Sequence, residues 1–404
     1  MSTEYESSPK KQWYTIAVLS LLMGYASIST DMYLPALPSM SQSLQLNGWD
    51  VELTISSFLI GLCIGQLFWG PISDNYGRRL PIFAGITLFI VGSIGCYFST
   101  TVPSMIMWRI IQALGASTGP VLSRAMVQDL FTGNDRAKVF SNLITIMTLA
   151  PLIGPLLGGQ IIQYSTWRTI FVLLVFIGII TLFLIAKFPE SFPKEKRDKT
   201  HQVKVWKTYL SLLCNPQILL FNLAGCIMYF ATFAFVSSSP SIYINDFNVS
   251  PQYYGLLFGL NIVGITSVSY INGKLVRKLG SDTLIKIGAY LMGLSGLFLL
   301  YISLAGAEIN LLTYVTPIFL FMSSGVFIGP NMMAKLLSLA PNSVGANSAL
   351  SGSLQFGFGV LGSSTISFLP WEPKMTLPLI MGIVAIGVFF VSKLCLKREK
   401  LHLF

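Results

Sequence analysis

Long apolar runs alternate with short polar or charged breaks along the whole chain. A helix needs about 20 mostly apolar residues to cross the hydrocarbon core of a bilayer. The pattern predicts twelve such helices, over residues 14–38, 51–72, 80–98, 103–128, 138–162, 167–187, 211–237, 251–273, 283–304, 309–336, 345–369 and 375–395. The hydrophobic pattern therefore predicts an all-α membrane protein with twelve transmembrane helices.

The one long polar break lies in the middle of the chain, at residues 188–210, and is rich in lysine. It separates six predicted spans from six others, which favours two pseudo-symmetric six-helix bundles of similar size. We expect an N-terminal bundle at residues 1–190, a flexible cytosolic linker at 191–210 and a C-terminal bundle at 211–404.

The chain carries 26 lysines and arginines against 16 acidic residues, a formal net charge of +10. In the predicted topology, all of the basic residues except Arg109, Arg168 and Lys374 fall on one side of the membrane. Because lysine and arginine are enriched in cytoplasmic loops, we assign that side to the cytosol. We expect a multi-pass protein of the bacterial inner membrane, in contact with its lipids and with both termini cytosolic. The confinement of positive charge to short loops also argues against a nucleic-acid partner.

Composition narrows the function further. Only 10% of the residues are charged, against about 25% in soluble globular proteins. The five cysteines are scattered through apolar runs and match no metal-binding or disulfide pattern. The sequence holds no nucleotide-binding loop and none of the motifs of serine hydrolases or zinc proteases. We therefore expect no cofactor, no metal and no enzymatic activity.

A specific motif follows the second predicted span, where Gly70, Asp74, Gly77, Arg78 and Arg79 stand in the order G-x-x-x-D-x-x-G-R-R. We expect the first glycine to let two helices approach closely, the acid to pair with an arginine, and the second glycine to permit a tight turn. The equivalent place in the second half, residues 273–280, keeps the glycines and basic residues but lacks the acid. The motif resembles the signature loop of the major facilitator superfamily, which implies the major facilitator fold.

Three further segments resemble the drug–proton antiporters of that superfamily. The fourth span contains R-x-x-Q-x-x-G at residues 109–115, and the fifth contains G-P-x-x-G-G at residues 154–159. The first span contains S-T-D-M-Y-L-P-A-L-P at residues 29–38, which is similar to the bicyclomycin-resistance branch. The resemblance implies export of bicyclomycin, of chloramphenicol-like antibiotics, or of small metabolites such as cysteine, in exchange for protons.

The fifth predicted span combines prolines with glycines. Pro151 and Pro155 each remove a backbone hydrogen bond, and Gly154, Gly158 and Gly159 leave a groove in which another helix can pack. We interpret this segment as a hinge or sliding interface between the bundles. Tight static packing is the alternative interpretation.

Two ionisable residues lie deep inside predicted spans. Asp31 is the only such acid and lies seven residues before Pro38, the outer end of the first span. Arg109 lies six residues after Pro103, the outer end of the fourth. At a rise of 1.5 Å per residue, both are roughly 9–10 Å below the outer edge, so they can share a layer.

An ionisable residue inside a membrane span is a functional candidate because its burial is costly. We predict that Asp31 carries the coupling proton and that Arg109 is its partner, because a change in their separation alters the proton affinity of the carboxyl. Neither histidine lies in a predicted span, so a histidine relay is not expected. Gln112, one turn from Arg109, is placed to extend the network. A static ion pair that fixes helix packing is the alternative.

We expect a substrate cavity between the halves, near the bilayer midplane. Its candidate residues are polar or aromatic positions inside the spans: Tyr25, Tyr33, Ser117, Asn222, Tyr229, Phe233, Asn261, Asn331 and Gln355. Such a pocket favours neutral, zwitterionic or cationic amphipathic molecules over multiply charged anions. Two other functions stay open: a dedicated exporter of one endogenous metabolite or siderophore, and a proton symporter that imports a nutrient. We expect the transporter to be a monomer.

Overall fold

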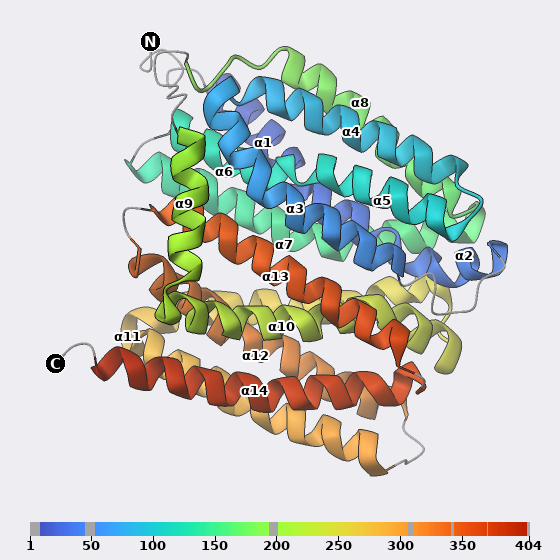
Figure 1. Cartoon of the computed structure of the whole chain (residues 1–404). Coiled ribbons are helices and arrows are strands. Elements are labelled where there is room, and N and C mark those ends of the chain that lie inside the picture. The colour runs from blue at the N-terminus through green and yellow to red at the C-terminus, as the bar shows by residue number, and fades with distance from the viewer. Residues whose placement is uncertain are drawn as a thin grey trace.

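The computed structural model describes residues 9–44, 53–131, 133–193, 201–305, 310–340, 343–369 and 371–401. All regular elements in these ranges are helical, and most of them run side by side along one axis (Figure 1). The helices of the first half lie together in the upper part of Figure 1, and those of the second half lie together below them. This arrangement confirms the predicted all-α class.

The first half contains α1 (Pro9–Asp31), η2 (Leu34–Ala36), α2 (Leu37–Ser43), α3 (Leu53–Tyr76), α4 (Arg79–Phe98), α5 (Val102–Ala116), α6 (Thr118–Leu130), α7 (Gly133–Tyr164) and α8 (Arg168–Ala186). Two of its six predicted spans are interrupted. The first is interrupted after Asp31 because Pro35 can neither donate a hydrogen bond to the carbonyl of residue 31 nor avoid a clash with it. The fourth changes direction at Ser117, where Pro120 acts in the same way on the carbonyl of Ala116.

The second half contains α9 (His201–Leu213), α10 (Pro216–Pro240), η4 (Ser241–Asp246), α11 (Pro251–Ala305), α12 (Leu311–Ser338), α13 (Val344–Phe368) and α14 (Pro373–Leu401). Gly280 interrupts α11 with a left-handed φ of 76°, so α11 is two helices that meet end to end. Across the described residues, eight helices are long and apolar enough to span a membrane, and α11 is long enough to do so twice. Each of the twelve predicted spans coincides with a helix or with a pair of successive helices.

The predicted linker at residues 191–210 is helical from His201 onward. Helix α9 crosses one end of the molecule and connects the two halves (Figure 1). Tyr209 and Leu212 are buried, and the ring of Trp206 lies 5.4 Å from that of Phe68 in α3. The sequence shows these apolar residues at helical spacing, but the lysines between them led to the prediction of a flexible linker.

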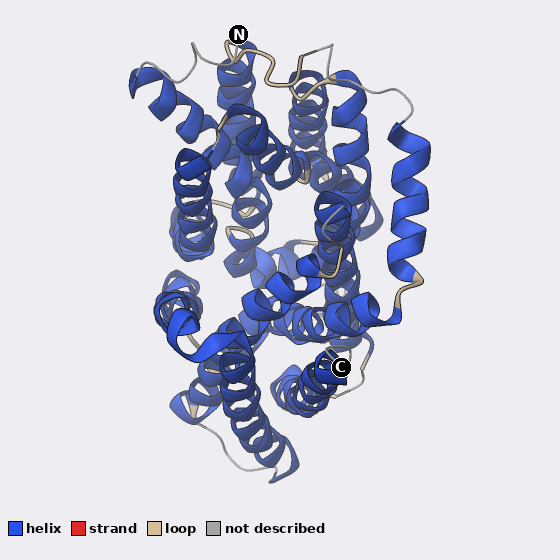
Figure 2. Cartoon of the chain, turned by 90° about the vertical axis from the view of Figure 1, so that its left-hand side faces the viewer, coloured by secondary structure: helices blue, strands red, loops and turns tan. Residues whose placement is uncertain are grey.

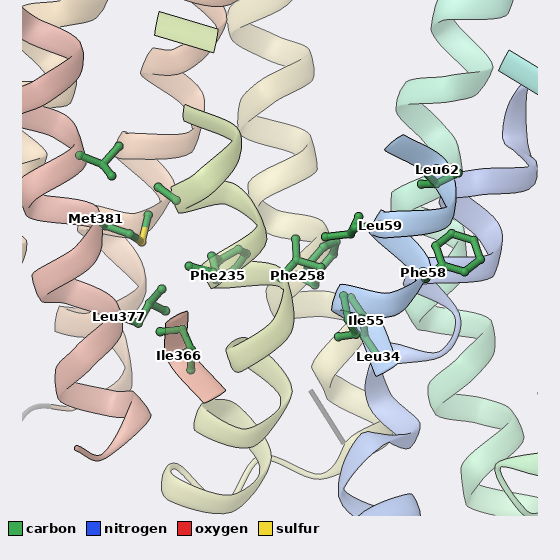
Figure 3. Close-up of a cluster of buried hydrophobic side chains, with 14 of the residues drawn as sticks. Leu34, Ile55, Phe58, Leu59, Leu62, Phe235, Phe258, Ile366, Leu377 and Met381 are labelled. Atoms are coloured by element: carbon green, nitrogen blue, oxygen red, sulfur yellow. The ribbon is translucent and has the colours of Figure 1, made fainter. Parts of the chain in front are cut away.

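Helix α1 begins and α14 ends on the same side of the molecule, on the left in Figure 1. We call this side the terminal end and the opposite side the distal end. Figure 2 views the terminal end and shows the two halves as separate groups of helices, with α9 at their edge. The halves share one buried hydrophobic cluster, which includes Leu59 of α3 and Phe258 of α11 (Figure 3). This shared core joins the two bundles.

Candidate functional site

A cavity of about 540 Å³ lies between the two halves. Helices α1, α3 and α6 line it from the first half, and α10, α12 and α13 line it from the second. It reaches toward the terminal end, because Phe221, Leu336 and Ser348 on its wall lie close to the terminal ends of α10, α12 and α13. The volume is typical of small-molecule sites, which range from about 300 to 1,000 Å³.

Three of the nine residues predicted to bind substrate line this cavity: Asn222, Tyr229 and Gln355. Phe233 lies behind the wall, with its ring centroid 5.9 Å from that of Tyr229 and 6.0 Å from that of Phe356. The cavity wall is therefore partly aromatic and partly amide.

The other five predicted residues do not line the cavity, and their hydrogen bonds lie within one half. The hydroxyl of Tyr25 donates to Thr181 Oγ1 at 2.7 Å, and the hydroxyl of Tyr33 shares a hydrogen bond of 2.6 Å with Thr54. Ser117 donates to a backbone carbonyl of α5. The side-chain amides of Asn261 and Asn331 likewise donate within the second half. Polar groups inside a bundle are often used in this way to join helices.

The residue that gives the cavity its charge is not among the nine predicted from the sequence. Arg124 of α6 lies on the wall, together with Ser27 and Gln66. It falls inside the predicted span 103–128, but its place near the end of that span led to its being counted with the cytosolic loop charges. The interruption at Ser117 orients α6 so that Arg124 faces the cavity.

Asp31 lies deeper than the cavity, one turn of α1 beyond the lining residue Ser27. It is 7% exposed. A Cβ atom added to Gly154 would lie only 3.0 Å from the Cβ of Asp31, so α7 packs directly against this point. Within the described ranges, the carboxylate has no hydrogen-bond or ion-pair partner. A carboxyl without a fixed partner occupies the interruption of the first span.

Arg109 is fully buried between α1, α3 and α5. Its Nη1 donates to Gln112 Oε1 at 2.7 Å and to the Ser29 carbonyl at 3.3 Å. Its guanidinium carbon lies 4.5 Å from the ring centre of Tyr33 and 4.2 Å from that of Phe58. Two aromatic faces and two oxygen acceptors therefore stabilise this buried cation.

The predicted partnership of Asp31 with Arg109 is not an ion pair in this structure. Arg109 contacts α1 at Ser29, and residues two apart on a helix point about 200° away from each other. Asp31 therefore faces α7, whereas the guanidinium lies on the other side of α1. Equal depth does not bring two side chains together unless the rotation of their helices also turns them toward each other, and here it does not.

The terminal end of the first half is held together by Arg78. Its guanidinium donates to Asp74 at 2.6 Å and to Asp129 of α6 at 2.8 Å, and its backbone N–H donates to Glu190 at 2.8 Å. Burial by itself would lower the pKa of Arg78, but the hydrogen bond to Asp129 and the two nearby carboxylates outweigh it and raise that pKa. Gly77 makes the turn with a φ of 87°.

Gly70 does not lie at a close helix contact, contrary to the expectation. A Cβ atom added there would have no neighbour within 4 Å. Ser56 and Cys63 lie on the same face of α3, fourteen and seven residues earlier, and they hydrogen-bond with Ser363 and Ser353 of α13. The two halves therefore touch along α3 as far as its middle and separate before Gly70.

The second half repeats this arrangement with the charges exchanged. Gly280 has a φ of 76°, like Gly77, and Gly273 has open space around it, like Gly70. The acid missing from residues 273–280 is replaced by Asp282, which pairs with Lys335 of α12 at 2.6 Å. In each half, the loop after the second span is thus tied by an ion pair to the end of the fourth.

The distal end is closed by α7 and α11. A Cβ atom on Gly159 would lie 2.7 Å from the Pro251 carbonyl, and one on Gly255 would lie 2.8 Å from the Leu156 nitrogen. A Cβ atom on Gly158 would overlap the Met32 carbonyl oxygen. Pro151 and Pro155 lie inside α7, which continues through both. The glycines of the antiporter-type motif therefore allow α7 to pack closely on backbone of the other half at Gly159 and on the first span of its own half at Gly158.

Comparison with known proteins agrees with this architecture. The family model described as Major Facilitator Superfamily matches residues 19–364. An uncharacterized MFS-type transporter of Bacillus subtilis is 32% identical over 91% of this chain and 93% of its own length. A bicyclomycin resistance protein homolog of Haemophilus influenzae is 28% identical over 95% of this chain and 97% of its own. The crystal structure of a D-xylose-proton symporter shares the fold, with a TM-score of 0.77 at 18% identity over 94% of this chain and 97% of that one.

Proposed function

Because the chain belongs to the major facilitator superfamily, we propose that it is a proton-coupled antiporter that exports drugs or small amphipathic metabolites across the bacterial inner membrane. The observation that carries the proposal is the cavity of about 540 Å³ between the halves, with a lone carboxyl one turn deeper. The similarity to a bicyclomycin resistance protein homolog supports drug export.

The terminal end faces the cytosol in this proposal. It carries basic residues of both halves, including Arg78, Arg79 and Lys335, and lysine and arginine are enriched on the cytosolic side. The distal end is then periplasmic, and the structure corresponds to the state that receives substrate from the cytosol. Alternating access requires a second state in which α3 and α13 close at the terminal end while α7 and α11 separate.

Asp31 is the proton carrier in this mechanism. Its Cβ atom lies against Gly154 of α7, the helix that packs on α11 at the distal end. Opening that interface would change the surroundings of the carboxyl and hence its affinity for a proton. Proton release and substrate binding are then linked through one conformational equilibrium.

Arg109 and Gln112 act as positioning residues for the interrupted first span. Arg109 binds the Ser29 carbonyl and covers the Tyr33 ring, so it contacts the chain on both sides of Asp31. Gln112 accepts from Arg109 and donates to Ser93 Oγ at 2.8 Å, which connects the arginine to α4. This network fixes the geometry within which Asp31 is protonated.

The proposal is tested first by screening bicyclomycin, chloramphenicol and other antibiotics for reduced susceptibility when the full chain is expressed in an efflux-deficient bacterium. Everted vesicles energised by respiration should then lose part of their pH gradient when an exported compound is added. The Asp31→Asn variant should abolish this response, whereas Asp246→Asn, which removes an exposed acid at the distal end, should not. Undiminished proton exchange by Asp31→Asn would refute the assignment of the carrier.

The same vesicles discriminate between the two remaining functions. A symporter that imports a nutrient would alkalinise the medium of intact cells when its substrate is added, and it would confer no drug tolerance. A dedicated exporter of one metabolite or siderophore would collapse the gradient with that compound alone. The breadth of the response therefore decides whether the protein exports many compounds or one.

A further inference from the structure

The lining of the central cavity carries a single kind of charge. Among the described lining residues, Arg124 is the one ionisable side chain with a full charge at neutral pH, and no carboxylate accompanies it. The nearest acid along α6 is Asp129, which accepts a hydrogen bond from Arg78 at 2.8 Å. Asp31 lies deeper, against α7. Neither acid neutralises Arg124 within the cavity.

Arg124 also lacks a hydrogen-bond acceptor in the part of the chain that the structure describes. A guanidinium has five N–H donors and no acceptor, so it needs oxygen atoms around it. Arg109 meets that need in part within the bundle: its Nη1 donates to Ser29 and Gln112 and two aromatic rings cover the guanidinium, while Nε and Nη2 have no hydrogen-bond partner among the described residues. The guanidinium of Arg124 borders the cavity, so its oxygen acceptors would have to come from there. It lies close enough to Tyr229 to interact with it electrostatically. Leaving a partly buried cation unpaired is costly, which favours a ligand that brings the acceptor.

The other residues of the cavity wall indicate the chemistry of the rest of that ligand. Tyr229, Phe356 and Met332 provide an aromatic and apolar surface. Asn222 also lies on the wall, and its side-chain oxygen is buried without a hydrogen bond. The site therefore suits a molecule with an apolar body, a hydrogen-bond donor and an anionic group.

We propose that the transported molecules are amphipathic organic anions or zwitterions, whose carboxylate binds Arg124 while the apolar body packs on Tyr229 and Phe356. This inference rests on the proposed export function and specifies its substrate class. The sequence favoured neutral, zwitterionic or cationic substrates over multiply charged anions; with Arg124 on the wall, the inference keeps the zwitterions and adds singly charged organic anions. A cation in the same place would be repelled by Arg124, so the site selects by charge as well as by shape.

The test uses the purified full chain in nanodiscs of zwitterionic lipid and three probes of equal framework. These are 4-phenylbutyrate, 4-phenylbutanamide and 4-phenylbutylamine, with charges of −1, 0 and +1. Binding is measured by calorimetry. We expect the carboxylate to bind at least tenfold more tightly than the amide, and the amine to bind most weakly.

Variants separate the guanidinium from general effects of charge. Arg124→Gln should lose at least tenfold in affinity for the carboxylate and leave the amide unchanged. Arg124→Lys should keep part of the preference. Arg277→Gln removes an exposed arginine outside the cavity and should change nothing. Because the wild-type comparison of the three probes requires no substitution, a folding defect in a variant leaves the inference testable.

The outcomes distinguish this inference from the function on which it rests. Equal binding of all three probes, or tighter binding of the amine, would overturn the anion preference while leaving export intact. A carboxylate preference that Arg124→Gln does not reduce would overturn the role of Arg124. The anion preference would also be contradicted if the susceptibility screen detects export of antibiotics but no preference for acidic ones. A screen and a vesicle assay that detect no transport would instead remove the proposed function itself.

Discussion

Two arginines inside the first half show how differently one side chain can be surrounded. Arg109 is enclosed by two rings and two oxygen acceptors within one bundle. Arg124 borders the cavity between the bundles. The first environment is closed and suits a structural role, although Nε and Nη2 of Arg109 have no hydrogen-bond partner among the described residues. The second environment is open and suits a ligand.

Replacing Arg109 with lysine tests the first of these roles. Nη1 of Arg109 donates to both Ser29 and Gln112 while the planar guanidinium stacks on Tyr33 and Phe58, and an ammonium group cannot do both at once. Loss of buried hydrogen bonds to a charged group costs about 1.5–3 kcal/mol each, so Arg109→Lys should lower the thermal midpoint of the purified protein and reduce transport. The exposed Arg277→Lys is the matched control. An unchanged midpoint would show that the guanidinium is unnecessary.

The positions of the buried charges could be predicted from the sequence, but their partners could not. A lone acid in an apolar run identified Asp31, and the search for charges inside spans identified Arg109. Side-chain direction around a helix depends on where each helix is interrupted and on how it is rotated. The interruptions after Asp31 and at Ser117 follow from Pro35 and Pro120, which are visible in the sequence, but the rotation of each helix is not.

At the scale of the helices, the two halves use matching ion pairs of unequal burial. Arg78 is 6% exposed and contacts three acidic residues, whereas the side chains of Lys335 and Asp282 are 17% and 43% exposed. Buried and exposed ion pairs contribute very differently to stability. The terminal end of the first half is therefore the more tightly held of the two.

The matched variants Arg78→Gln and Lys335→Gln compare these ion pairs directly. Breaking a buried pair typically costs about 3–5 kcal/mol, and losing an exposed one costs about 0.2–1 kcal/mol. We expect Arg78→Gln to lower the thermal midpoint strongly and Lys335→Gln to lower it slightly. Equal shifts would mean that the exposed pair is part of a larger network.

Glycine contacts along α7 make a second prediction at this scale. A methyl group on Gly158 would overlap the Met32 carbonyl, whereas one on Gly293 of α11 would have no neighbour within 4 Å. Gly158→Ala should therefore destabilise the protein by about 1–3 kcal/mol. Gly293→Ala should be neutral or stabilising by up to about 1 kcal/mol, because alanine favours helix. Denaturation of both variants in the same detergent measures the difference.

For the whole molecule, the separation of the halves beyond the middle of α3 leads to a prediction about conformational change. Gly70 and Gly273 occupy matching places and have open space around them. Gly70→Leu should fold normally yet block closure of the terminal end. We expect a cysteine at Ser348, in an otherwise cysteine-free chain, to stay reactive to an impermeant maleimide applied from the terminal side. The control is the same reporter chain with Gly70 retained, in which substrate-driven closure should protect the cysteine from the maleimide. Equal protection of the cysteine in the Gly70→Leu chain would contradict this expectation.

The twelve spans and their division into halves could be read from hydropathy, because a bilayer imposes a minimum length on every apolar helix. The cavity could not be read in this way. It is formed by residues of six helices that lie far apart in the sequence, such as Ser27, Arg124 and Gln355. The sequence motifs identified the helix interfaces around the cavity. Which side chains line the cavity depends on how the two bundles pack against each other, and no motif records that.

The lone positive charge on the cavity wall has an electrical consequence. Expelling a monoanion while admitting one proton moves two positive charge equivalents into the cell per cycle. The membrane potential contributes about 2.3 kcal/mol per charge at 100 mV, or about 4.6 kcal/mol for the cycle. That amount corresponds to roughly a thousandfold gradient of the exported compound. Voltage alone could then sustain expulsion in alkaline surroundings, where the chemical gradient of protons has vanished.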